Sequence, residues 1–251
     1  MRSGSTLLGE AIYFAGKMGC PLEYFHRGFR PPLAQEWQAE DIHSFIRAVY
    51  RFRTDPSGML SVKLFWKDIE DIVCELDTEG FPELRNTPAV LTGEAVYSKI
   101  REMLAEIFPN PTFIHLERLD RVRQAVSMMV AAQTRLWRSI PGVGEHVPVE
   151  GPSYDYDRIL NCMAYTDHCK THWKNFFRVT GDARLEVTYE DLLRDYDATL
   201  KQIFDHVGCS GPLLPPRMLR QSNATSERIA LRFLREYADK IASAAVTVTS
   251  R

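Results

Sequence analysis

The feature that most constrains the fold is an alternation of short apolar segments with longer amphipathic ones. The apolar segments are typical of strands and cover residues 60–66, 112–117 and 184–188. Around them, apolar side chains recur at the three- and four-residue spacing of helices. The helices expected on this basis cover residues 7–18, 33–53, 67–76, 94–108, 119–137, 156–179 and 189–207. This order predicts an α/β fold, with a parallel sheet flanked by helices.

The composition fits one globular domain over residues 1–251, with a frayed tail over residues 242–251. The chain is 45% hydrophobic and 25% charged, with a net charge of -2, which excludes a disordered chain. Because the charge is near neutral, no nucleic-acid partner is expected. Five scattered cysteines favour free thiols in a reducing compartment. No apolar run is long enough for a transmembrane segment or a signal peptide, so a cytoplasmic location is expected.

A short segment of hydroxyl residues around one glycine directly precedes the helix expected from residue 7. It comprises Arg2, Ser3, Gly4, Ser5 and Thr6. A glycine permits a tight turn, and a helix N-terminus offers N–H donors and the positive end of a dipole. The arginine adds a planar fork that suits phosphate or sulfate. The GxxxxGK[ST] spacing of a P-loop is absent, so the segment predicts a related anion site, with a capped, flexible N-terminus as the plain alternative.

Two histidines on one expected helix raise the question of a metal. His168 and His172 are four residues apart, with Cys169 beside them, and zinc sites use this spacing. The sequence shows no HExxH pattern and no third ligand near them. No metal site is therefore predicted.

Five segments along the chain stand in the order of a known family. They are residues 2–8 (RSGSTLL), 19–25 (GCPLEYF), 61–66 (SVKLFW), 118–134 (RLDRVRQAVSMMVAAQT) and 187–192 (VTYEDL). Together they resemble the bacterial sulfotransferases of the trehalose 2-sulfotransferase type, over about residues 1 to 235. The resemblance implies a P-loop-like parallel sheet and a sulfotransferase activity.

The resemblance also bears on the N-terminus. In that family a strand ending in proline precedes the Arg-Ser-Gly-Ser-Thr loop, and here Met1 stands at the proline position. The first strand is therefore expected to be missing at the N-terminus. Either the true start lies further upstream, or the chain is a truncated form whose donor binding is impaired.

The donor that the resemblance implies is 3′-phosphoadenosine 5′-phosphosulfate (PAPS), used as a substrate without a metal. A nucleotide with charge at two ends needs two anion sites. Residues 2–6 are expected to hold the 5′ end, and Arg118 with Ser127 the 3′-phosphate. Arg121 and Arg123 are the alternatives to Arg118, and a solvated helix face is the plain reading of both.

Two later residues are expected to contact the same nucleotide. Tyr189 is expected to touch the adenine, with a core tyrosine as the open alternative. Arg220, with Arg217 in a proline-rich loop, is expected to close over the nucleotide, with a solvated loop as the alternative.

Sulfuryl transfer depends mainly on positioning, charge stabilisation and a base for the acceptor hydroxyl. The resemblance places the base at Glu23; an ordinary surface carboxylate is the alternative. Lys63 lies in an apolar run, where a charge needs a partner, so it either helps the chemistry or extends to the edge of the sheet.

The acceptor that the resemblance implies is a carbohydrate or a glycolipid sugar. Its expected contacts are Glu23, Tyr24, Phe25 and Arg30. A homodimer is expected from similar proteins. The other functions considered are a nucleotide-binding module without turnover and, more distantly, a P-loop kinase.

Overall fold

The computed structural model describes residues 2–81, 84–85, 87–140, 151–218 and 221–249. The chain forms two compact units. Unit 1 comprises Met1–Arg2, Arg118–Thr166 and Pro216–Arg251, and unit 2 comprises Ser3–Glu117 and Asp167–Pro215. Each unit has its own apolar packing. The assignment of a single domain stays a prediction.

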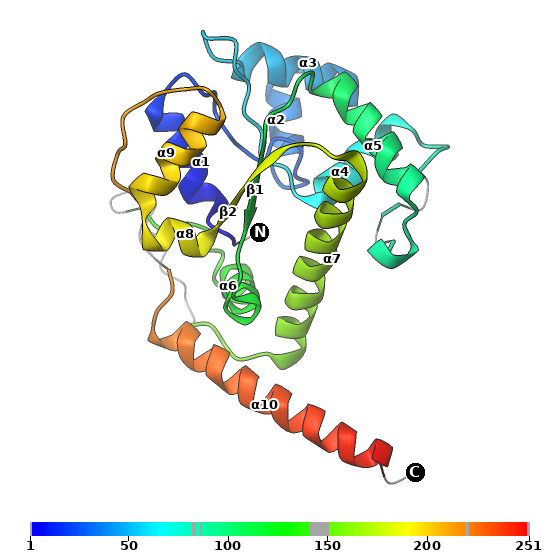
Figure 1. Ribbon diagram of the computed structural model, residues 1–251, viewed down its shortest axis with the longest axis vertical. Coiled ribbons are helices and arrows are strands. Elements are labelled where there is room, and N and C mark those ends of the chain that lie inside the picture. The colour runs from blue at the N-terminus through cyan, green and yellow to red at the C-terminus, as the bar shows by residue number, and fades with distance from the viewer. Residues whose placement is uncertain (1, 82–83, 86, 141–150, 219–220, 250–251) are drawn as a thin grey trace. The chain divides into compact units, whose positions relative to one another are not determined.

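Unit 2 contains a parallel two-stranded sheet formed by β1 (Phe113–Glu117) and β2 (Arg184–Thr188), which lie side by side in Figure 1. The pairing runs from Phe113 opposite Arg184 to Glu117 opposite Thr188. Two of the three predicted strands and their parallel direction are therefore confirmed. The protein is a mixed α/β structure, and the P-loop-like topology stays a prediction.

The third predicted strand, over residues 60–66, is wrong. Of these residues only Val62 forms a bridge, in parallel to Leu22, and Lys63 N–H donates to the Leu22 carbonyl at 2.9 Å. An apolar, β-branched segment becomes a strand only where a neighbour pairs along its length. The isolated bridge nevertheless aligns two short segments that both carry charged residues.

The helices of unit 2 surround this sheet region in sequence order. They are α1 (Ser5–Ala15), α2 (Arg30–Glu36), α3 (Ile42–Arg53), α4 (Trp66–Leu76), the 3-10 turn η1 (Ala89–Leu91), α5 (Glu94–Ile107), α8 (Tyr189–Arg194) and α9 (Tyr196–His206). The long helix α7 (Tyr156–Thr180) contributes to both units. In the described part of the chain, no helix combines the length and apolarity that crossing a membrane requires.

Two predicted helices are each split in two by capping residues. The helix expected over residues 33–53 breaks where Gln38 adopts a positive φ of 57°. Asp41 then starts α3 with a capping box, in which its side chain accepts from Ser44 N–H at 2.6 Å. The helix expected over residues 189–207 breaks at Asp195, which ends α8 and caps α9. Local side-chain hydrogen bonds thus overrode a continuous apolar pattern.

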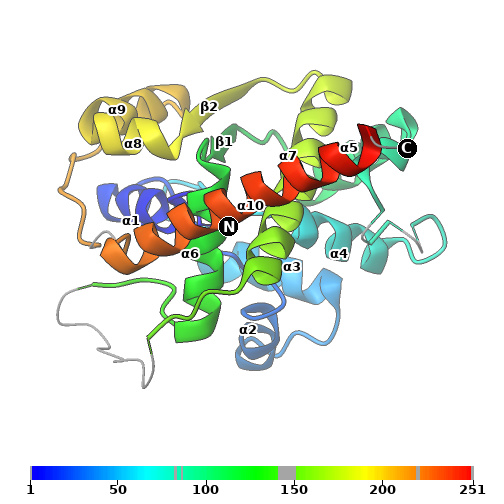
Figure 2. The ribbon, with the colours of Figure 1, turned by 90° about the horizontal axis from the view of Figure 1, so that it is seen from below.

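Unit 1 is built from α6 (Arg121–Thr134), the first part of α7 and α10 (Ala224–Thr249). Figure 2 shows α10 crossing α6. Ala125 and Met129 of α6 and Phe233 of α10 are fully buried in one apolar cluster. The sequence pattern did not predict α10, whose helix also includes part of the segment expected to be a frayed tail.

Candidate active site

The N-terminus of α1 is shaped by Gly4. This residue is the N-cap of α1 and has φ 85° and ψ 7°, a left-handed conformation that favours glycine. A Cβ atom at Gly4 would lie 2.8 Å from the Cδ2 atom of Tyr189. The Tyr189 ring therefore lies against the turn that starts α1. Because Gly4 has no side chain, it leaves the first N–H groups of the helix without a side-chain cap, as an anion site requires.

Arg2 is held by three acceptors in unit 1. Its Nε donates to Ser127 Oγ at 2.9 Å, and its two terminal nitrogens donate to the Trp137 carbonyl and to Gln221 Oε1, both at 2.5 Å. The buried Arg118 side chain approaches from the other side, donating to the Arg2 carbonyl at 3.5 Å. Three residues expected to bind the donor, Arg2, Arg118 and Ser127, therefore lie together.

A charged pair lies at the single bridge between residues 22 and 62. Lys63 Nζ is 2.9 Å from Glu23 Oε1, and the two side chains are only 12% and 16% exposed. The bridge sets this geometry, because it aligns the residues that directly follow Leu22 and Val62. The alternatives left open for Lys63 are thus decided: its ammonium is paired with the carboxylate expected to be the base.

The environment of Glu23 contains a second acid, Asp68 in the first turn of α4. Its side chain is nearly inaccessible and accepts a hydrogen bond from Phe65 N–H at 2.8 Å. Burial raises the pKa of Asp68 to about 7, and the negative charges of Glu23 and Asp71 add to the rise. The sequence did not single out Asp68, because an acid three residues after a helix start is usually a plain cap.

The residues after Glu23 turn into the core. Tyr24 and Phe25 are 0% and 2% exposed, and the Tyr24 hydroxyl donates to the Cys20 carbonyl at 2.5 Å. Arg30 forms a two-pronged ion pair with Glu75, at 2.5 and 2.7 Å. Of the expected acceptor contacts, only Glu23 and Arg30 therefore have charged groups in partly accessible positions.

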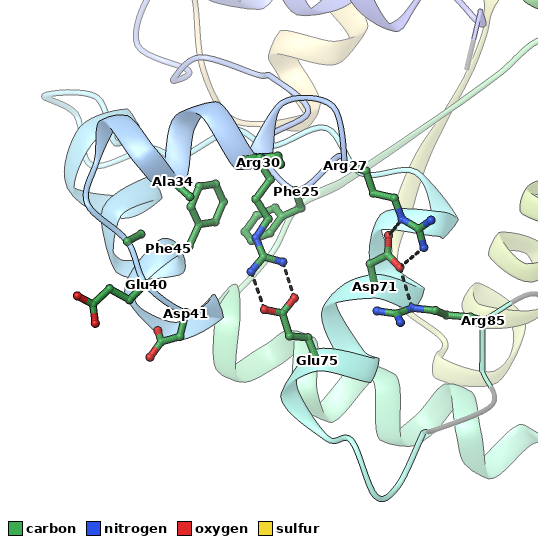
Figure 3. A pocket seen from close by; sticks show the side chains of 12 residues that line it. Phe25, Arg27, Arg30, Ala34, Glu40, Asp41, Phe45, Asp71, Glu75 and Arg85 are labelled. Atoms are coloured by element: carbon green, nitrogen blue, oxygen red, sulfur yellow. Dashed lines mark hydrogen bonds and ion pairs between the residues drawn. The ribbon is translucent and has the colours of Figure 1, made fainter.

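A cavity of about 660 Å³ opens between α2, α3 and α4 (Figure 3). Its lining is Phe25, Arg27, Arg30, Pro31, Ala34, Ala39, Glu40, Asp41, Phe45, Asp71, Glu75 and Arg85. Asp71 binds two arginines at once: Arg27 at 2.6 and 2.7 Å and Arg85 at 2.9 Å. Although burial opposes ionisation, the hydrogen bonds and charges of these arginines hold the pKa of Asp71 below its usual value.

The two histidines of α7 form a cluster with Glu70, a member that the sequence did not reveal. The possible ligand atoms of Glu70, His168 and His172 lie within 4.8 Å of one another. However, Lys67 Nζ and His168 Nε2 already bind the Glu70 carboxylate, at 2.7 and 2.8 Å. A metal would have to displace the lysine ammonium.

His172 itself is engaged through both ring nitrogens. Nε2 lies 3.0 Å from the Thr87 carbonyl, and Nδ1 lies 3.0 Å from the Tyr97 hydroxyl. Because a carbonyl only accepts, Nε2 carries the proton and Nδ1 accepts from the tyrosine. Burial lowers the pKa of His172 to about 4, and Trp66 stacks on its ring at 4.7 Å. The cluster therefore acts as a satisfied polar network within the core.

Comparison with known proteins identifies the family. The model of the Stf0 sulphotransferase family matches residues 1–236. The chain belongs to this family. It is 26% identical over 262 residues to the trehalose 2-sulfotransferase of Mycobacterium tuberculosis strain Erdman, an alignment covering 94% of this chain and 92% of that protein. It is 25% identical over 260 residues to the trehalose 2-sulfotransferase of Mycolicibacterium smegmatis, with the same coverage.

The expected residues of this Stf0 sulfotransferase fall into three places. In unit 1, Arg2, Arg118 and Ser127 lie together. In unit 2, Gly4 lies against Tyr189, and Glu23 pairs with Lys63. Arg220 lies outside the described residues.

Proposed function

We propose that this Stf0 sulfotransferase moves a sulfuryl group from PAPS to a hydroxyl of a carbohydrate. Membership of the family supports sulfuryl transfer, and the names of the two mycobacterial relatives support a sugar acceptor. The observation that carries the assignment of roles is the Glu23–Lys63 pair, because it combines a shielded carboxylate with a cation. A homodimer stays a prediction.

In the proposed reaction, an acceptor hydroxyl oxygen attacks the sulfur of the donor in line. The bond between sulfur and the bridging phosphate oxygen breaks, and 3′-phosphoadenosine 5′-phosphate leaves with the electron pair. The Glu23 carboxylate takes the hydroxyl proton, as a general base. Lys63 keeps Glu23 oriented and places positive charge where the leaving oxygen gains negative charge.

For the donor, Ser3, Gly4, Ser5 and Thr6 would offer N–H and hydroxyl groups to the 5′-phosphosulfate, and Tyr189 would face the adenine. Arg118 and Ser127 would bind the 3′-phosphate. The bond from Arg2 to Ser127 supports placing the Arg2 guanidinium with this second group, because the two side chains already share one position. Arg220 stays a prediction from the sequence.

The test is transfer of labelled sulfate from PAPS to trehalose by the full chain. We expect Glu23→Gln to lower turnover by roughly 100-fold or more, which is the usual contribution of a general base. Binding of 3′-phosphoadenosine 5′-phosphate, measured by calorimetry, is expected to persist.

The matched control is Glu236→Gln on α10, which also breaks a glutamate–lysine pair, here at 3.0 Å. Turnover is expected to be unchanged in this control. If Glu23→Gln keeps full turnover, Glu23 is not the base; if the wild-type protein does not bind 3′-phosphoadenosine 5′-phosphate, the proposed donor is wrong.

A further inference from the structure

We propose that the cavity between α2, α3 and α4 is a subsite for a second, uncharged sugar unit of the acceptor. This inference rests on the proposed function, since it concerns the part of the acceptor that is not sulfated. The cavity volume, about 660 Å³, is within the range of small-molecule sites. All of its lining residues belong to unit 2.

The polar groups of the cavity are already oriented. Arg27 and Arg85 grip Asp71, and Arg30 grips Glu75 with two hydrogen bonds (Figure 3). A carboxylate offers about four lone-pair directions, so these contacts leave acceptor capacity for sugar hydroxyls. Because the arginines fix both carboxylates in advance, little side-chain ordering would be needed on binding.

The charge balance points to an uncharged ligand. Three arginines line the cavity, namely Arg27, Arg30 and Arg85, and four carboxylates, namely Glu40, Asp41, Asp71 and Glu75. The near cancellation disfavours a phosphate, which needs an excess of cations, and also a free cation. A ligand rich in hydroxyl groups can donate to the carboxylates and accept from the arginines at once.

The remaining lining is apolar. Phe25 and Phe45 are buried beneath the cavity at 2% and 0% exposure, and Pro31, Ala34 and Ala39 complete this part. The C–H face of a sugar ring packs on such a surface while its hydroxyls bind polar groups at the rim. A mixture of apolar surface and a few fixed polar groups is the usual form of a ligand site.

The cavity also adjoins the proposed base. Phe25 follows Glu23 by two residues, and Asp71 follows Asp68 by three on α4. Burial lowers the pKa of His26, whereas the charges of both Glu23 and Asp71 act to raise it. A single side chain that senses both carboxylates places the cavity within electrostatic range of Glu23.

The experiment compares trehalose with glucose as acceptor, at saturating PAPS. We expect Asp71→Asn to lower the ratio of kcat/KM for trehalose to that for glucose by about tenfold, the effect of losing one hydrogen bond to a charged group. The KM for PAPS and the kcat/KM for glucose are expected to stay within about twofold of wild type.

Two further variants make the result specific. Glu75→Gln is a second test at a more exposed position, in case Asp71→Asn lowers stability, and it is expected to reduce the same ratio. Asp182→Asn is the matched control, because Asp182 is similarly shielded and pairs with Arg101 at 2.6 Å outside the cavity lining. The acceptor ratio is expected to be unchanged in this control.

The outcomes separate the inference from the proposed function. An unchanged acceptor ratio in both cavity variants, or equal losses for both sugars, would overturn the subsite while leaving sulfotransfer intact. If the wild-type protein sulfates neither sugar, the proposed acceptor fails. In that event, calorimetry of trehalose with 3′-phosphoadenosine 5′-phosphate present decides the subsite: equal affinities of wild type and Asp71→Asn, or no binding, overturn it.

Discussion

Asp68 shows how burial changes the behaviour of a single carboxyl group. It accepts a backbone hydrogen bond that favours its charged form, yet burial raises its pKa to about 7. Its neighbours Glu23 and Asp71 are both acidic, so a charged Asp68 would face two like charges. The folded protein therefore holds a proton on Asp68 at a pH where an unfolded chain would release it.

This binding of a proton makes stability depend on pH. An unfolded aspartate titrates near about 3.9, so the contribution of Asp68 to stability is complete below that pH and is lost as the pH rises through about 7. We expect the free energy of unfolding of Asp68→Asn, relative to wild type, to rise over this window by up to about 1.4 kcal/mol per pH unit. Urea unfolding at several pH values measures this difference.

The control is Asp191→Asn. The hydrogen bond from the Thr188 hydroxyl lowers the pKa of Asp191, so its contribution is lost only at more acidic pH. The free energy of unfolding of this variant, relative to wild type, is expected to show no trend from about pH 4 to pH 7. A flat difference for Asp68→Asn as well would contradict the raised pKa. His172 acts in the opposite direction in wild type, so only differences between proteins are informative.

Residue-scale chemistry also bears on the donor. We expect Arg118→Ala and Ser127→Ala each to weaken binding of 3′-phosphoadenosine 5′-phosphate by about tenfold or more, because each removes a donor to the 3′-phosphate. Binding of adenosine 5′-phosphosulfate, which lacks that phosphate, is expected to be spared. Arg121→Ala is the control for the alternative arginine. Calorimetry with both nucleotides measures the selectivity, and equal losses for the two would show that these residues do not bind the 3′-phosphate.

At the scale of elements, α4 is a buried helix that carries four carboxylates. The partners differ for each: Phe65 N–H for Asp68, Lys67 and His168 for Glu70, Arg27 and Arg85 for Asp71, and Arg30 for Glu75. A helix with this charge density stays buried only because other segments supply these partners. The helix itself was predictable from its apolar spacing, but its partners were not.

The turn before α1 gives a prediction at the same scale. Gly4→Ala would force a Cβ into a left-handed conformation and to within 2.8 Å of Tyr189 Cδ2. Gly58→Ala is a matched control, because Gly58 has a φ of 87° but nothing within 4 Å of the added Cβ. Both variants are expected to lose roughly 1–2 kcal/mol from backbone strain.

Only Gly4→Ala is expected to weaken donor binding as well, since its Cβ displaces Tyr189. Thermal unfolding measures the shared loss of stability, and calorimetry with 3′-phosphoadenosine 5′-phosphate measures the difference. If the two variants bind the nucleotide equally well, the contact between Gly4 and Tyr189 has no part in the donor site.

At the scale of the whole molecule, the two units have separate apolar clusters. Phe233 of α10 belongs to the cluster of unit 1, whereas Ile72 of α4 belongs to unit 2. We expect Phe233→Ala to destabilise unit 1 by about 3–5 kcal/mol, because it leaves a cavity in a full core. Hydrogen exchange is then expected to accelerate in α6 and α10 more than in α4. Equal acceleration in all three helices would show that the chain unfolds as one cooperative unit.

The sequence by itself determined most helices, both strands of the sheet and the family, because apolar periodicity and short motifs are local properties. It did not predict the breaks at Gln38 and Asp195 or the existence of α10. These depend on capping bonds and on an apolar face whose partner is distant in the chain.

Only the tertiary structure decided which charges meet. The pairing of Lys63 with Glu23, the contact of Arg2 with Ser127 and the third member of the histidine cluster, Glu70, all join segments far apart in the sequence. Periodicity describes which face of an element is apolar, but it carries no information on the neighbour across that face. The cost of burying an unpaired charge then selects the partner, and this selection operates only once the chain has folded.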